Sequence, residues 1–430
     1  MLSKLKAKAP YVLWVLLALS GCGGGGGGSS TDPDAPLTTA QWQQDVDFVA
    51  TQMETTHPSL FHSITRQEFR TAVDALKADI ATLTRNEIFV RLKKLVALPA
   101  MEKDGHTLVP MFRATGFRVF PLRLYEFSDG VFVIDANAPY QNAIGQRIVQ
   151  IGGMDIDQVN LIIDPLITRD NETTVRQKRT LHYVVPELLE TLGIIPDAEQ
   201  GDYLLESATG DFTTLLVTPI DTQTYQGTLE DTVGLPQQSE PLYLSNRGER
   251  FWMQLLNESN SLYIRYNLVL ADTQSGLTIS GFSAQIASIV ANNNVQKVII
   301  DVRHNGGGNN ATFGPLIDVL SSSAINQPNK LYALIDRVTF SAAGNFVAVL
   351  DQRTNAIFVG EPTGGSPNNY GDAVQVNLPN SGFGVVIPTR YLEVAPGDQR
   401  TAVSPDIPVS LNAADYFDRR DPVLEAAIAN

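Results

Sequence analysis

Three short segments of the sequence carry residue types that can cooperate in acyl transfer. Residues 104–107 (Asp-Gly-His-Thr) supply an imidazole, and a neutral histidine is the usual general base for a serine nucleophile. Residues 298–308 read as a buried strand that runs into three consecutive glycines, whose backbone N–H groups can face one point and hold a developing oxyanion. Residues 334–344 place Ser341 between the end of a predicted strand and the start of a predicted helix.

Each of these segments also has a structural interpretation. Ser341 can simply cap the following helix, although the free N–H groups of a helix N-terminus also favour negative charge that develops on a serine. A lone histidine such as His106 is more often a hydrogen-bonded structural residue than a base. The glycine turn can be a plain turn, but no Gly-Lys-Ser/Thr follows it, which disfavours a nucleotide-binding loop. The chemical interpretation therefore depends on the three segments occurring together.

The elements around Ser341 and the glycine turn alternate between strand and helix patterns. This alternation predicts a layered α/β unit in which helices cover a sheet. The predicted strands are residues 262–269, 297–302, 331–335 and 356–359, and the predicted helices are 282–291, 313–320 and a helix from Ala342. A polar, proline-containing stretch over 226–240 predicts a linker before this unit.

Two further units precede the linker. Apolar residues recur at helix spacing over 42–53, after an N-cap at Thr38 or Thr39. Two more helices are predicted over 66–76 and 85–98. From residue 116 to residue 224 short strands and turns take over, with β-rich runs at 131–134 and 147–151 and a turn at 152–153. Residues 144–159 resemble the strand, turn and helix of a PDZ domain, a module that binds extended peptide as an added strand.

The N-terminus is typical of an exported lipoprotein. A basic start is followed by an apolar run over 11–19, which is too short for a membrane span. The run leads into Leu19-Ser20-Gly21-Cys22. Small residues before a lone cysteine resemble a lipobox, so we expect cleavage before Cys22 and lipid attachment to it; the alternative is an ordinary signal peptide. Residues 23–30 form a Gly/Ser tether. Gly23 resembles outer-membrane sorting, which places the protein in the bacterial cell envelope, facing the periplasm or the cell surface.

Charge and composition narrow the classes of partner. The net charge is −15, so the surface repels nucleic acid and anionic lipid, and we expect membrane contact only through the lipid anchor. Cys22 is the single cysteine, which excludes an intrachain disulfide and a cysteine-based zinc site. None of the five histidines forms a His-Glu-x-x-His motif, so we expect no metal and no cofactor. The sequence does not indicate an oligomeric state.

Five motifs occur in an order that resembles the tail-specific (carboxy-terminal processing) serine peptidase family. They are "DGHT", "IIDVRHNGGG", "TFSAAG", "VGEPTGGSPNNYGD" and "SPDIPV", within a resemblance that runs from about Thr38 to Val409. The resemblance implies a serine-type endopeptidase that acts on peptides or proteins, with Ser341 as the nucleophile. It also implies Gly307 and Ala342 as oxyanion-hole donors and a catalytic layer related to the crotonase and ClpP folds.

The family divides on its general base. One branch uses a lysine in a "GKG"-like turn, but the corresponding turn here ends in Ser366. The tricorn-core-like branch uses a histidine in a "D-x-H-T" setting, so the resemblance implies His106. That branch carries a Glu seven residues before the Asp of the closing Pro-Asp, which is Asp406 here, and this chain has Gln399 at that position. Glutamine can orient an imidazole but cannot offset its charge, so the third catalytic residue stays open between Gln399, Glu393 and Asp398.

Together these inferences predict a multi-domain α+β protein. We expect a lipoprotein signal peptide over 1–21, a Gly/Ser-rich tether over 22–36, a helical domain over 37–112, a PDZ-like domain over 113–225 and an α/β catalytic domain over 241–430. The predicted function is hydrolysis of peptide bonds in exported proteins or peptides through an acyl-enzyme on Ser341. The alternative is a non-catalytic ligand- or peptide-binding lipoprotein on the same scaffold, because a fold does not fix a function.

Overall fold

A computed structural model describes residues 36–112, 115–224 and 240–430 of the chain. The predicted signal peptide, Cys22 and nearly all of the predicted tether lie outside the described residues, as does most of the predicted linker. Within the described ranges no helix is both long and apolar enough to cross a membrane.

Three helices open the described chain, as the apolar spacing predicts. They are α1 (Thr39–Thr56), α2 (Arg66–Asp79) and α3 (Arg85–Ala97). Each begins at a threonine N-cap, Thr38, Thr65 or Thr84, that forms a capping box with the residue three positions on. These reciprocal bonds satisfy backbone N–H groups that the first turn of a helix leaves without partners.

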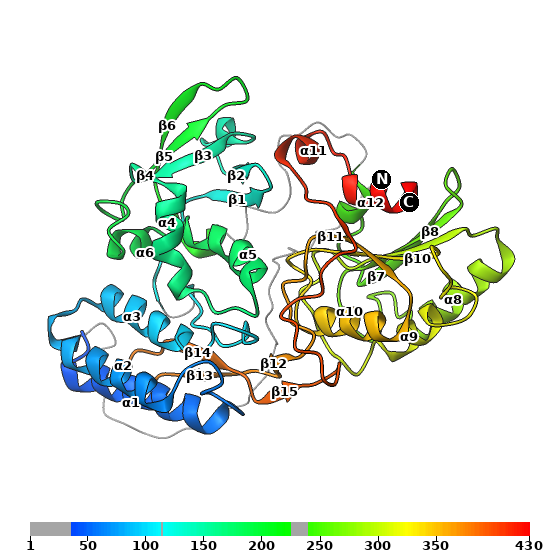
Figure 1. Cartoon of the computed structure of the whole chain (residues 1–430). Helices are drawn as coiled ribbons and strands as arrows, with labels where there is room; N and C mark the ends of the chain where they lie inside the picture. The colour runs from blue at the N-terminus through cyan, green and yellow to red at the C-terminus, as the bar shows by residue number, and fades with distance from the viewer. Residues whose placement is uncertain (1–35, 113–114, 225–239) are drawn as a thin grey trace, which may run out of the picture.

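The core of these helices includes a hairpin from the far end of the chain. Strands β13 (Val374–Asn377) and β14 (Gly384–Ile387) pair antiparallel and lie against α1–α3 in Figure 1. The ring of Phe383, between them, lies 5.6 Å from that of Trp42 and 5.2 Å from that of Phe89. The N-terminal helices are therefore fixed to the C-terminal half of the molecule by aromatic packing.

The middle of the chain forms an antiparallel sheet in the order β1-β2-β3-β5-β6, with β4 paired to β3. Its strands are β1 (Leu122–Phe127), β2 (Gly130–Ala136), β3 (Arg147–Ile151), β4 (Met154–Asp155), β5 (Gly201–Glu206) and β6 (Phe212–Val217). Helices α4 (Ile156–Ile163), α5 (Glu172–His182) and α6 (Pro186–Thr191) accompany it. The predicted β-rich runs at 131–134 and 147–151 are confirmed as parts of β2 and β3.

The C-terminal part is the predicted layered α/β unit. Its sheet has the order β16-β11-β10-β9-β8-β7, parallel except for the antiparallel β7–β8 pair. The strands are β7 (Phe251–Leu256), β8 (Ser261–Tyr266), β9 (Lys297–Asp301), β10 (Leu331–Ile335), β11 (Ile357–Gly360) and β16 (Ile407–Pro408). The helices are α8 (Ile279–Asn292), α9 (Gly314–Leu320), α10 (Ala342–Arg353), α11 (Ala413–Phe417) and α12 (Pro422–Ala429).

Alternate residues of the central strands face opposite hydrophobic cores. Val298 and Ile300 of β9 belong to the core that includes residues of α8, α9 and α10. Ile299 belongs to a second core with Val423 and Leu424 of α12. Both faces of β9 are therefore covered, which explains why this parallel strand reads as a continuous apolar run.

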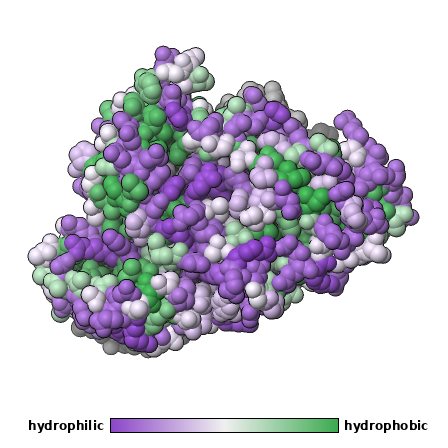
Figure 2. All heavy atoms as spheres, in the orientation of Figure 1, coloured by the Kyte–Doolittle hydropathy of each residue, from purple (hydrophilic) through white to green (hydrophobic). Residues whose placement is uncertain are grey.

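Strands β12 (Asn369–Gly371) and β15 (Arg390–Leu392) pair antiparallel between the helical unit and the α/β unit (Figure 1). On the face drawn in Figure 2, hydrophilic residues predominate and hydrophobic residues form separate small groups. That face thus shows no broad apolar band of the kind that marks a large docking surface.

Candidate active site

Ser341 lies where β10 has ended and α10 is about to begin. We call residues 336–344 the Ser341 turn. Ser341 has φ 52° and ψ −129°, a conformation that costs energy for any residue with a Cβ atom. It occupies the N-cap position of α10 but makes no side-chain capping bond. The interpretation of Ser341 as a simple helix cap is therefore wrong, because its hydroxyl is directed elsewhere.

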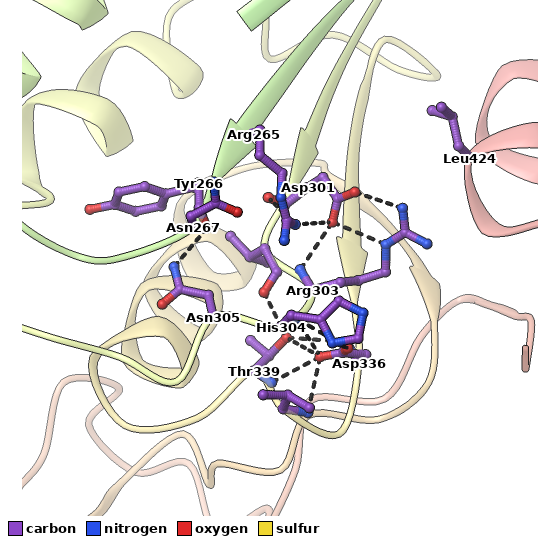
Figure 3. A network of polar contacts seen from close by, with 12 residues as sticks. Arg265, Tyr266, Asn267, Asp301, Arg303, His304, Asn305, Asp336, Thr339 and Leu424 are labelled. Atoms are coloured by element: carbon purple, nitrogen blue, oxygen red, sulfur yellow. Dashed lines mark hydrogen bonds and ion pairs between the residues drawn. The ribbon is translucent and has the colours of Figure 1, made fainter. Parts of the chain in front are cut away.

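A network of buried polar groups shapes the end of β10 (Figure 3). The carboxylate of Asp336 accepts backbone N–H bonds from His304 at 3.1 Å and from Val338 and Thr339 at 3.0 Å each. Asp301, at the end of the neighbouring strand β9, forms ion pairs with Arg265 at 2.9 Å and Arg303 at 2.6 Å. Because the carboxyl ends of parallel strands meet at one edge of the sheet, these contacts fix the glycine turn beside the Ser341 turn.

Gly307 lies directly against Ser341. A Cβ atom added at Gly307 would lie 2.6 Å from the Cβ of Ser341, and φ at Gly307 is +119°. Only glycine fits this approach. Asn305 joins the two turns, since its backbone carbonyl accepts the N–H of Phe340 at 3.1 Å.

The two predicted oxyanion donors differ in their availability. The backbone N–H of Ala342, the first residue of α10, has no acceptor in the described part of the chain. The N–H of Gly307 donates to Oδ1 of Asn305 at 3.0 Å. Gly307 can therefore donate to an oxyanion only by sharing or releasing that bond, whereas Ala342 is free to donate.

His106 is brought to Ser341 from 235 residues away. Its Nε2 lies 2.9 Å from the Ser341 hydroxyl oxygen, which is hydrogen-bond distance for a base and a nucleophile. His106 is 8% exposed, and its imidazole packs on the ring of Phe340 with centroids 4.6 Å apart. We call residues 103–108 the His106 loop. At its C-terminal end, Leu108 exchanges backbone hydrogen bonds with Val386 of β14.

Burial, together with the nearby positive charge of Lys178, lowers the pKa of His106 to about 4. The charges of Asp104 and Asp372 and the backbone of Tyr370 act in the opposite direction but do not offset burial. The neutral imidazole that a general base requires is therefore present throughout the neutral pH range.

The far nitrogen of His106 has no acid beside it. Nδ1 makes no well-formed hydrogen bond to any described residue. Gln399 and Glu393 are both exposed, and Asp398 is engaged by Arg400 in an ion pair of 2.6 Å. None of the three residues considered for the third catalytic position thus contacts the imidazole in this structure.

One group of described residues has the composition of a metal site. Ligand atoms of His57, His62 and Asp104 lie within 4.8 Å of one another. However, Nδ1 of His57 accepts the backbone N–H of Ser59 at 3.1 Å, which leaves the proton on Nε2. That Nε2 lies 3.2 Å from the carboxylate of Asp104, without a well-formed hydrogen bond between them. Because its Nε2 carries the proton, His57 presents no free lone pair to a metal ion.

Two charged residues behind the His106 loop were not predicted from the sequence. Asp170 accepts the N–H of Gly105 at 2.7 Å, and Nζ of Lys178 donates to the carbonyl of the same residue at 2.9 Å. Neither residue belongs to a recognisable motif, and both lie in the segment that we predicted to bind peptide. No signal in the sequence alone distinguishes them from surface charges.

No protein-family model and no curated protein sequence matches the chain. Among solved structures, that of mature CPAF has a TM-score of 0.62 at 14% identity and covers 91% of this chain and 98% of that chain. The structure of mature CPAF complexed with lactacystin has a TM-score of 0.60 at 14% identity and covers 91% and 99%. The photosystem II D1 C-terminal processing protease has a TM-score of 0.40 at 14% identity, which is too low to support a conclusion. The chain thus has the mixed α/β fold of mature CPAF over nearly its whole described length.

Proposed function

We propose that this protein is a serine-type peptidase that cleaves peptide bonds through an acyl-enzyme on Ser341, with His106 as the general base. The observation that carries the proposal is the 2.9 Å contact between Nε2 of His106 and the Ser341 hydroxyl, made by two buried segments that are distant in the sequence. The constrained backbone of Ser341 and the free N–H of Ala342 beside it support the same assignment.

In the proposed mechanism His106 removes the hydroxyl proton as the Ser341 oxygen attacks the substrate carbonyl. The N–H of Ala342 stabilises the oxyanion, and Gly307 joins it if the bond to Asn305 is shared. His106 then donates its proton to the leaving amine, and water hydrolyses the acyl-enzyme by the reverse sequence. Because no carboxylate contacts Nδ1, the imidazolium formed in the first step is less stabilised than in a complete triad, and a low turnover rate is expected.

The remaining parts of the proposal come from the sequence. The antiparallel sheet of β1–β6 is proposed to act as a PDZ-like module that presents extended peptide, and the α/β unit as a crotonase-like catalytic layer. Lipid attachment at Cys22 would hold the protein at the cell envelope, where exported proteins or peptides are the available substrates.

Turnover of a p-nitrophenyl ester and of a fluorogenic peptide mixture by the purified protein tests this proposal. We expect a burst of nitrophenol equal to the enzyme concentration, followed by slow steady turnover, and loss of both in Ser341→Ala. Ester turnover without peptide cleavage would indicate an esterase. A protein with neither a burst nor steady turnover would support the non-catalytic binding protein instead.

A further inference from the structure

We infer that Asp170 is a positioning residue that holds His106 against Ser341, with Lys178 as its partner. This inference rests on the proposed function, but it concerns residues that neither the motifs nor the fold similarity assigns. The need for such a residue arises because no carboxylate of the described residues contacts Nδ1 of the imidazole, the atom through which a triad acid normally orients the ring, and Nδ1 makes no well-formed hydrogen bond to them.

Asp170 connects the two sides of the candidate site. Its Oδ1 accepts the N–H of Gly105, immediately before His106, at 2.7 Å. Its Oδ2 accepts the N–H of Ser366 at 2.8 Å. Ser366 follows Gly365, whose own N–H donates to Thr339 in the Ser341 turn at 3.0 Å. One fully buried carboxylate therefore links the His106 loop to the segment that supports Ser341.

Lys178 holds the opposite side of the same residue. Its Nζ donates to the carbonyl of Gly105 at 2.9 Å and to the carbonyl of Thr168 at 2.9 Å. Both backbone groups of Gly105 are thus bound by charged side chains, and hydrogen bonds to charged groups are the stronger kind. The charges of Asp170 and Lys178 also stabilise each other.

The space around Gly105 is too small for a residue with a side chain. A Cβ atom at this position would lie 2.9 Å from the ring of Phe340 and 3.1 Å from Oδ1 of Asp170. The imidazole of His106 also packs on the ring of Phe340. The peptide before His106 is therefore confined on three sides, by Phe340, Asp170 and Lys178, so the position of the imidazole is set through its backbone.

Asp45 provides a matched control. It is a fully buried aspartate that also accepts two backbone N–H groups, one on each oxygen: Asn380 at 2.9 Å and Ser381 at 2.8 Å. It joins α1 to the β13–β14 hairpin. Oδ1 of Asp45 also accepts the side-chain amide of Asn380 at 2.8 Å. Asp45→Asn therefore disturbs at least as many hydrogen bonds as Asp170→Asn, at a position away from the candidate site.

The experiment compares fluorophosphonate labelling rates and peptide kinetics of Asp170→Asn and Asp45→Asn in the wild-type and His106→Ala backgrounds. In the wild-type background we expect Asp170→Asn to lower kcat by about 100-fold with KM within about twofold, since small misplacement of a base costs rates of that order. In His106→Ala it should lower the residual rate by less than about threefold, because it acts through His106. Asp45→Asn should lower the melting temperature without a comparable loss of rate. Equal losses from Asp170→Asn in both backgrounds, or from both aspartate variants, would overturn the inference.

Imidazole NMR separates this inference from the proposed function. If the unmutated protein shows no reactivity, the proposed function fails, but the position of His106 can still be measured. Asp170→Asn should shift or broaden the ring signals of His106, assigned with His106→Ala, and Asp45→Asn should leave them unchanged. His106 signals that are the same in Asp170→Asn and wild type would contradict a positioning role.

Discussion

Nε2 of His106 and the hydroxyl oxygen of Ser341 lie 2.9 Å apart, but the His106 loop and the Ser341 turn that carry them are built in different ways. The Ser341 turn is held by groups at the ends of its own sheet: Asp336 binds the backbone of the turn, and Asn305 on the neighbouring glycine turn binds Phe340. The His106 loop belongs to no regular element, and it is held by Asp170 and Lys178, which are 65 and 73 residues further along the chain from Gly105. The nucleophile is thus part of the α/β core, whereas the base depends on how three units pack together.

The difference indicates which kind of structural damage should displace Ser341 and which should displace His106. Damage to the sheet edge should disable the nucleophile directly, whereas damage to the packing between units should move the base and leave the nucleophile in place. The variants below separate these two kinds of damage.

Gly307→Ala should give the largest effect on the Ser341 side. The added methyl group would lie 2.6 Å from the Cβ of Ser341 and would occupy a backbone conformation that alanine disfavours. We expect labelling to fall by at least about 100-fold, the order of magnitude seen when an oxyanion hole is disrupted. Gly314→Ala in α9 is the control, because a Cβ there has no neighbour within 4 Å. Gly307→Ala with wild-type labelling would show that the close approach is unimportant.

The pH profile reports on the His106 side. The base must be neutral, and the pKa of His106 is lowered to about 4, so the step that reports protonation of the base should lie near pH 4. Burial raises the pKa of Asp170 to about 6, so its bonds to the loop should weaken as pH falls through that value. We therefore expect two acidic steps in kcat/KM. In Asp170→Asn, where the step of that carboxyl is absent, a remaining step near pH 6.5 would contradict the buried environment of His106.

Lys178→Met sharpens this prediction. The lysine charge lowers the pKa of both His106 and Asp170, so its removal should move both acidic steps to higher pH. At pH 5 the variant should retain a smaller share of its pH 8 activity than the wild type does. Lys77→Met is the control, since Lys77 of α2 pairs with Asp47 of α1, away from His106. Identical profiles for wild type and Lys178→Met would exclude an electrostatic effect of Lys178 on the base.

Gln399→Glu should give the smallest effect. Gln399 is exposed and does not contact His106, so a carboxylate at this position should change kcat by less than about threefold, as expected for surface charges in water. A rise of tenfold or more would mean that residue 399 reaches Nδ1 in the substrate complex. Such a result would restore the third catalytic position that the sequence resemblance indicated.

The Ser341 turn and the His106 loop also differ in how far they could be predicted from the sequence. The three capping boxes at Thr38, Thr65 and Thr84 and the strand ends near Ser341 are local patterns, so the helices and the α/β unit could be predicted. The contact between His106 and Ser341 required the resemblance to a family, because spacing alone does not bring residues 235 positions apart together. Asp170 lies in a loop before α5, and Lys178 lies on α5, which is rich in polar and charged residues. Neither could be found, because in the sequence both read like exposed charges.

Fluorophosphonate labelling of the purified protein, with the modified residue mapped by mass spectrometry, tests the central claim most directly. Wild type, Ser341→Ala and His106→Ala should be compared at pH 7.5 at equal protein concentration. We predict a single modified residue, Ser341, no labelling in Ser341→Ala, and a labelling rate at least about 100-fold lower in His106→Ala, the lower end for loss of a general base. An unlabelled wild-type protein, or labelling that His106→Ala leaves unchanged, would contradict the account of Ser341 and His106 as a catalytic pair.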